Sequence, residues 1–184
     1  MEESRIWWAY LSTLIECFDF NSIYSETILE NFKSFSKELM MKLDDEEIKY
    51  LTRNHLRNKP NFKKAFRHGI QIWSDLRRWL IEGDREAIVK TKVGLRMKGA
   101  SLAIRKLGHN VAVLDVLVLR KEFNLNSKEI KRVQSSIKKY LEYEEKLRMR
   151  YPDLISWDIT FWEKNSMNGR RVIELDDLFL EEIK

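Results

Sequence analysis

The chain has 184 residues, of which 43% are hydrophobic and 34% are charged. This apolar share is enough for a core, so the composition excludes a disordered chain and indicates one or two small domains. A single cysteine, Cys17, excludes an internal disulfide framework or a cysteine-ligated cluster and favours a reducing cytoplasm. The three histidines lack the spacing of metal ligands, so we expect no metal site. No apolar run approaches the roughly 18 residues that would span a membrane.

Positive charge is concentrated in one third of the chain. Residues 49–106 contain 16 Lys and Arg against 4 Asp and Glu, a net of +12, whereas the whole chain carries only +5 and the remainder is therefore acidic. Such asymmetry indicates a polyanionic partner, of which nucleic acid is the commonest. The alternative is a basic surface of the kind found in thermophiles, with no ligand.

Apolar residues recur at helical spacing, and only 6 Gly and 2 Pro interrupt the chain, so we expect an all-α fold. In the first part of the chain the expected helices cover residues 7–18, 28–39, 60–82 and 97–107, with a short helix within 42–59. Gly83 ends the third of these, and Asp84 is suited to cap the short helix that follows. Gly94 interrupts the chain before residue 97, and Gly108 ends the helix that begins there.

The second part of the chain is also expected to be helical. The expected helices cover residues 115–123, 126–147 and 152–162. Residues 111–119 have strand-forming side chains, but no second strand is evident to pair with them, so we expect an extended segment leading into the first of these helices. Asn126 and Glu129 resemble a capping box, and Pro152 fits the first turn of the last helix. The acidic tail, residues 173–184, either packs as a short amphipathic segment or stays loose.

The motif that carries chemistry lies within residues 93–120, where a short helix, a glycine-containing hairpin and a second helix form a helix-hairpin-helix. Such a hairpin offers backbone N–H groups to a DNA phosphate without reading bases. The matching residues are Gly94-Leu-Arg-Met-Lys-Gly-Ala-Ser101, then Arg105 and Gly108, then Val113-Leu-Asp115. Here the sequence resembles the helix-hairpin-helix (HhH-GPD) DNA glycosylases, most closely the archaeal-type 8-oxoguanine DNA glycosylase/AP lyases. Weaker likeness extends over residues 3–172.

The resemblance implies a bifunctional enzyme that excises oxidised purine, 8-oxoguanine above all, from double-stranded DNA without a cofactor. Lys98 would be the nucleophile that attacks C1′ and forms a Schiff base, and Asp115 would deprotonate it or stabilise the cationic sugar. The damaged base would be flipped into a pocket. There, Trp162 would stack on the base and Asp158 would lie nearby. The implied DNA-binding residues are Lys92, Gly94, Arg96, Gly99, Ser101 and Arg105.

The resemblance also implies a two-lobed helical fold. Residues 21–110 would form a middle lobe that ends in the hairpin, and residues 1–20 would join residues 111–184 in the other lobe. We expect a monomer in the cytoplasm of a prokaryotic or archaeal cell, associated with the nucleoid at work and not with a membrane.

Other interpretations stay open beside this one. Arg96 stands where the family has the hairpin's second glycine, and Val116-Leu117 stand where it has Arg-His, which favours a non-catalytic DNA-binding relative. A helical protein-interaction module with fortuitous spacing is the third hypothesis. Taken alone, Lys98 would be a solvated helix lysine and Asp115 the N-cap of the next helix. Core packing is an equal alternative for Trp162.

Overall fold

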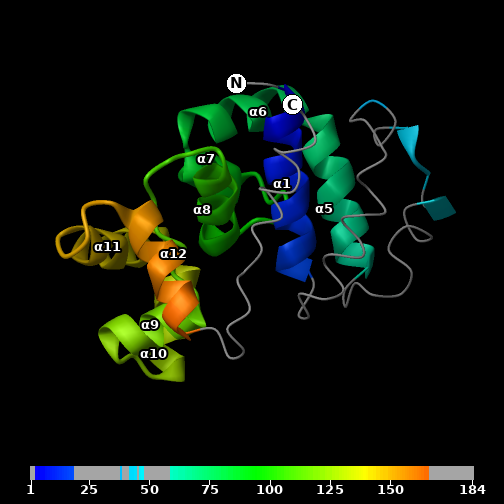
Figure 1. Ribbon diagram of the computed structural model, residues 1–184. Helices are drawn as coiled ribbons and strands as arrows, with labels where there is room; N and C mark the ends of the chain where they lie inside the picture. Colours follow the sequence, from blue (N-terminus) through cyan, green and yellow to red (C-terminus); the bar gives the residue numbers. More distant parts are fainter. Residues whose placement is uncertain (1–2, 19–37, 39–41, 45, 48–58, 166–184) are drawn as a thin grey trace.

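The computed structural model describes residues 3–18, 38, 42–44, 46–47 and 59–165. Every regular element within these residues is a helix (Figure 1), as the hydrophobic periodicity predicts. The helices are α1 (Glu3–Phe18), α5 (Lys59–Gln71), α6 (Trp73–Glu82), α7 (Arg85–Lys90), α8 (Met97–Lys106), α9 (Val116–Phe123), α10 (Ser127–Ser135), α11 (Ile137–Arg148) and α12 (Leu154–Asn165). The helix expected over residues 28–39, most of the segment 42–59 and the acidic tail lie outside the described residues.

Buried side chains form two clusters, and the helices fall into two groups according to the cluster that they contribute to. The first group is α1 with α5 to α8, and the second is α9 to α12. Met97, at the start of α8, is the exception, because it packs into the second cluster while the rest of α8 serves the first. The beginning of α8 therefore lies at the junction of the two groups.

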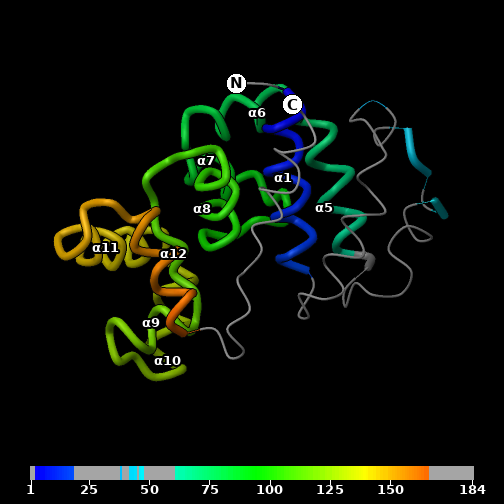
Figure 2. Tube along the Cα trace, viewed as in Figure 1, coloured from blue at the N-terminus to red at the C-terminus, as the bar shows by residue number. Residues whose placement is uncertain are grey.

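The helix α1 is the centre of the first group. All its residues from Ile6 to Ile15 are buried, so it has no polar face and needs cover on every side. It contacts α5, α6 and α8, and Figure 2 shows it between α5 and α8. Trp7 packs edge-on against Trp73, with ring centroids 4.9 Å apart. We expected the first helix to join the C-terminal helices; its buried side chains instead belong to the cluster of α5 to α8.

The helix ends follow the sequence signals closely. Gly83 closes α6 in the left-handed region, with φ of 73°, and the Asp84 carboxylate caps α7 by accepting a hydrogen bond from the Ala87 amide at 2.9 Å. The capping box at Asn126 and Glu129 is present at the start of α10. These ends are confirmed because each depends on residues within one or two turns of the chain.

Two expected long helices are each divided. Residues 60–82 form α5 and α6, which meet at a turn at Ile72, and residues 126–147 form α10 and α11, which meet at Ser136. Ser136 has extended backbone angles, and its hydroxyl accepts a hydrogen bond from the Lys139 amide at 3.4 Å. A serine is a better N-cap than an interior helix residue, and here it starts a new helix.

Tyr140 of α11 fixes the extended segment that links α8 to α9. Its buried hydroxyl donates to the Ala112 carbonyl at 3.3 Å and accepts from the Leu114 amide at 2.8 Å. Burial raises the pKa of this hydroxyl, so it keeps the proton that it donates. The segment is not a strand, as expected, since its backbone groups are satisfied by a side chain instead of a neighbouring strand. It delivers Asp115 to the start of α9.

Across the described ranges, the structure contains no helix that is both long and apolar enough to cross a bilayer.

Candidate functional site

The candidate site begins with the turn between α7 and α8. The chain leaves α7 at Thr91, and Lys92 and Gly94 both adopt positive φ, of 58° and 86°, before α8 begins at Met97. Lys92, Arg96 and the first-turn residue Lys98 are all exposed. No side chain caps the first turn of α8. The turn thus presents three cations beside backbone N–H groups that point away from the helix.

Two glycines of the motif, Gly94 and Gly99, lie against other helices. A methyl group on Gly94 would lie 2.6 Å from the Ala65 Cβ and 2.9 Å from a Leu14 methyl, so this glycine lets the turn approach α1 and α5. A methyl group on Gly99 would lie 2.8 Å from the Cys17 Sγ, where α8 crosses α1. Both were expected to approach DNA. The structure accounts for both by helix packing.

Three further predicted contacts are also taken up inside the protein. Ser101 is fully buried, and its hydroxyl accepts a hydrogen bond from Arg85 at 3.1 Å, so it cannot contact a phosphate. Arg105, expected at the DNA, forms a buried ion pair with Asp158, expected in the base pocket. The pair joins α8 to α12 across the junction. The sequence resemblance singled out both Arg105 and Asp158, but it gave no sign that they pair with each other.

Lys98 and Asp115 border the same buried cluster. Met97, which precedes Lys98, and Leu114, which precedes Asp115, both belong to the second cluster. Lys98 is exposed and Asp115 is half-buried. Asp115 caps α9, because its Oδ1 accepts a hydrogen bond from the Val118 amide at 2.9 Å. No hydrogen bond or ion pair joins Lys98 to Asp115 within the described residues.

A surface groove of about 470 Å³ runs along α12. Its aromatic wall is formed by Tyr151 and Trp157, whose rings stack with centroids 5.7 Å apart, together with Phe161. Arg150 and Lys164 also line it. Neither Trp162 nor Asp158, the two residues expected in a base pocket, lines this groove. Trp162 packs edge-on against Phe161 and against the second cluster, which agrees with a core role.

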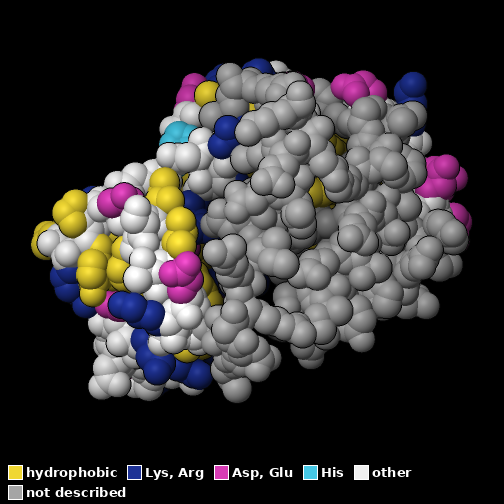
Figure 3. All heavy atoms as spheres, in the orientation of Figure 1, with side chains coloured by type: hydrophobic (Ala, Val, Ile, Leu, Met, Phe, Trp, Pro, Cys, Tyr) yellow, Lys and Arg dark blue, Asp and Glu magenta, His cyan; other side chains and the backbone are white. Residues whose placement is uncertain are grey.

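The basic segment found by counting charges, residues 49–106, is not a surface of unpaired cations. Many cations of residues 49–106 form ion pairs, namely Arg77 with Glu3, Arg78 with Asp75, Arg85 with Glu144, Lys90 with Glu86, Arg105 with Asp158 and Lys106 with Glu16. Exposed cations of α9 to α11 have no such partner among the described residues. Figure 3 shows Lys and Arg side chains gathered at the lower left, where α9 and α10 lie in Figure 1.

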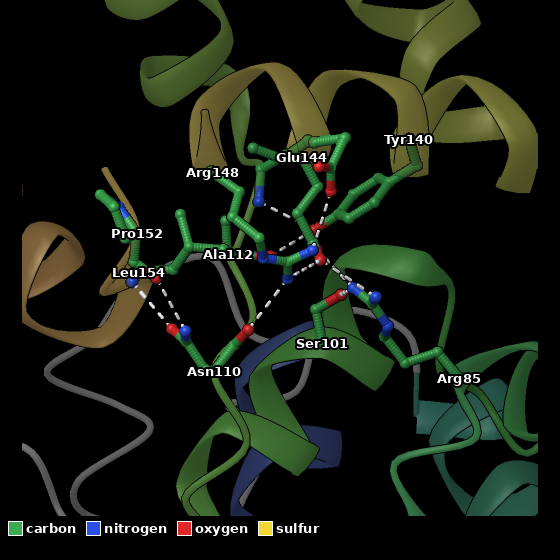
Figure 4. A network of polar contacts seen from close by, with 11 residues as sticks. Arg85, Ser101, Asn110, Ala112, Tyr140, Glu144, Arg148, Pro152 and Leu154 are labelled. Carbon is green, nitrogen blue, oxygen red and sulfur yellow. Dashed lines mark hydrogen bonds and ion pairs between the residues drawn. The ribbon is translucent and has the colours of Figure 1, made fainter. Parts of the chain in front are cut away.

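A buried polar network holds the two groups together (Figure 4). The Glu144 carboxylate of α11 pairs with Arg85 of α7 and, at 3.0 Å, with Arg148. Arg85 also donates to Ser101, and Arg148 donates to the Asn110 carbonyl at 3.0 Å. Every member therefore has a charged or hydrogen-bonded partner, which a buried charge requires. The network fixes the position of α8 relative to α11.

Among the residues that the structure describes, no group of three or more His, Cys, Asp or Glu side chains could hold a metal ion. Comparison with protein-family models, with curated proteins and with solved structures found no significant match to this chain.

Proposed function

We propose that this protein is a DNA glycosylase with AP lyase activity, built on the helix-hairpin-helix glycosylase fold, that removes oxidised purine from double-stranded DNA. The observation that carries the proposal is that Lys98 and Asp115 each directly follow a residue buried in the same cluster, Met97 and Leu114. Lys98 is exposed next to a tight turn bearing two more cations, and Asp115 heads the next helix. The order of short helix, turn, lysine-bearing helix and aspartate-capped helix supports the resemblance in the sequence.

In the proposed reaction, the neutral Lys98 amine attacks C1′ of a flipped nucleotide, and the bond from C1′ to the damaged base breaks. The base leaves with the bonding electrons and takes up one of the two amine protons. The bond from C1′ to O4′ then breaks, O4′ takes up the other proton, and the opened sugar becomes an imine on the Lys98 Nζ. Loss of a C2′ proton then expels the 3′ phosphate and nicks the strand. Asp115 stabilises the positive charge that develops on the sugar. Its Oδ1 is held by α9, whereas its Oδ2 has no hydrogen-bond partner within the described part of the chain.

Lys92 and Arg96 would hold the phosphates beside the flipped nucleotide. Both are exposed next to the uncapped first turn of α8, whose N–H groups and dipole favour an anion. Gly94, Gly99, Ser101 and Arg105 contribute indirectly, by packing α8 into the fold. We propose 8-oxoguanine as the first substrate to test. The ion pair of Asp158 with Arg105 gives no support to a direct role of Asp158 in reading that base.

A second candidate is a non-catalytic protein that binds DNA through the same turn. It is favoured by the interior roles of Ser101, Arg105 and Asp158, which leave the turn with cations but fewer of the family's contacts. Such a protein binds duplex DNA and forms no covalent intermediate. The two candidates therefore differ in whether a covalent protein–DNA intermediate forms.

Borohydride trapping separates them. Duplexes that contain either 8-oxoguanine or a preformed abasic site are incubated with the protein and borohydride, which reduces the imine to a stable covalent adduct. We expect an adduct that disappears in Lys98→Gln and persists in Lys64→Gln, an exposed lysine of α5 outside the proposed DNA-binding turn. Asp115→Asn keeps a good N-cap and should slow base excision more than trapping at the abasic site. Salt-sensitive binding without any adduct would refute the enzyme and support the second candidate.

A further inference from the structure

The outer face of α10 carries a row of cations. Lys128, Lys131 and Arg132 are spaced three and four residues apart, so they lie on one side of the helix, and all three are exposed. The opposite side carries Ile130 and Val133, which are buried in the second cluster. The helix is thus anchored by its apolar side, and its cationic side is directed to solvent.

These cations have no acidic partner within the described residues. The one acidic residue of α10, Glu129, is occupied as part of the capping box, where it accepts a hydrogen bond from the Asn126 amide at 2.8 Å. Further exposed cations flank the row on the neighbouring helices, namely Arg120 and Lys121 at the end of α9 and Lys138 and Lys139 at the start of α11. Figure 3 shows Lys and Arg side chains at the lower left, in the region where Figure 1 draws α9 and α10.

The chemistry of the surface selects its partner. Like charges at this spacing repel one another, and a ligand that carries many negative charges would offset this repulsion. A protein partner or a membrane would need exposed apolar or aromatic anchors. Among the large hydrophobic residues of α9 and α10, Val116 alone is exposed. The phosphate backbone of a nucleic acid requires only cations and hydrogen-bond donors.

The helix that carries the row packs beside the candidate site, because α10 contacts α8, the helix that bears Lys98. We propose that the outer face of α10, Lys128, Lys131 and Arg132, is a second phosphate-binding surface that holds the undamaged duplex beside the flipped nucleotide. The inference rests on the proposed function and adds to it a sequence-independent contact in the second group of helices. The turn at Lys92 and Arg96 provides the phosphate contact in the first group of helices.

The test compares two triple variants of the full chain with equal loss of charge. One neutralises the row as Lys128→Gln, Lys131→Gln and Arg132→Gln, and the other neutralises exposed cations of α5, α6 and α12 as Lys64→Gln, Arg78→Gln and Lys164→Gln. The affinity for an undamaged duplex is measured at several salt concentrations. Each lost phosphate contact lowers the slope of log affinity against log salt by about 0.9, so the row variant should lose about 2 to 3 units of slope. The control variant should keep nearly the slope of the unaltered protein.

Circular dichroism must first show that both variants remain folded, and the exposed positions of the substituted residues favour this. If the row variant unfolds, the three substitutions are measured singly. Each should then lower the slope by about one unit. A row variant whose slope equals that of the control overturns the inference. Trapping by Lys98 at an abasic site reports separately on the proposed function, since it needs the amine and not the row. If trapping persists while the slope is unchanged, the inference alone fails. If the unaltered protein neither binds duplex nor traps, both fail.

Discussion

The ion pair between Arg85 and Glu144 gives the sharpest prediction about stability. It links α7 in the first group to α11 in the second, and its two side chains are only 13% and 2% exposed. Replacing Glu144 by Met keeps a similar volume but removes the acceptor for two arginines. The guanidinium of Arg85 then stays in a nearly dry site with only the Ser101 hydroxyl as partner.

The cost follows from the burial of each partner. Removing one member of a buried ion pair costs about 3–5 kcal/mol, because the remaining charge is left uncompensated. Arg148 is 37% exposed and keeps Glu145 and the Asn110 carbonyl as partners, so its share is at most about 1 kcal/mol. We therefore expect Glu144→Met to lower the free energy of unfolding by about 3–5 kcal/mol, a large part of the ~5–15 kcal/mol typical of a folded domain.

Urea unfolding of the full chain, followed by circular dichroism and tryptophan fluorescence, measures this change. The matched control is Glu145→Gln, one residue away, whose 54% exposed carboxylate also pairs with Arg148 and should cost less than about 1 kcal/mol. The double variant Arg85→Met with Glu144→Met should recover most of the loss, since no charge is then stranded. If Glu144→Met unfolds within about 1 kcal/mol of the unaltered protein, the charge is not buried as described and the reasoning fails.

Other substitutions test single contacts. Tyr140→Phe should cost about 1–3 kcal/mol in urea unfolding, because it leaves a buried amide and a buried carbonyl without a partner; no loss would mean that the extended segment is held otherwise. Gly94→Ala should lower the free energy of unfolding by about 2–5 kcal/mol, because alanine disfavours the left-handed backbone of this position and its methyl group would overpack against α1 and α5. Gly108→Ala has the same backbone penalty but open space around it, so it should cost only about 1–2 kcal/mol. Hydrogen bonds from Ser156 hold the pKa of Asp153 below its usual range, so Ser156→Ala should raise that pKa in an NMR titration. That contribution to stability is present above the ordinary pKa of about 3.9 and is lost as the pH falls through the lowered value.

The parts of the fold that could be predicted from the sequence are those set by neighbouring residues. The cap at Asp84, the glycine end at Gly83 and the capping box at Asn126 are all present where the sequence places them. The extended segment before Asp115 was also predicted, because no second strand was evident to pair with it. Ser136 was the local signal that went unused, since a capping residue inside a long periodic run marks a possible break.

The parts that could not be predicted depend on partners far away in the chain. Arg105 and Asp158 are 53 residues apart, and nothing in their local spacing shows that they pair. The placement of α1 in the first group likewise depends on which helices enclose a helix without a polar face. A motif fixes the order of residue types along the chain, whereas burial decides which of them can reach a ligand. This is why Lys92, Arg96 and Lys98 remain available while Ser101 does not.

The same distinction decides which cations could contact DNA under the proposed function. By count, positive charge is concentrated in residues 49–106. Several arginines there are paired with acids, and two of them, Arg85 and Arg105, are only 13% and 12% exposed. What a phosphate can reach is an exposed cation without an acidic partner. Among the described residues, the turn before α8 and the outer face of α10 both offer such cations. They belong to different groups of helices, which the Glu144 network and the pair of Arg105 with Asp158 hold in fixed register. Under the proposed function, a duplex would contact both sets at once only if the junction between them does not move, and these buried ion pairs are the contacts that would hold it.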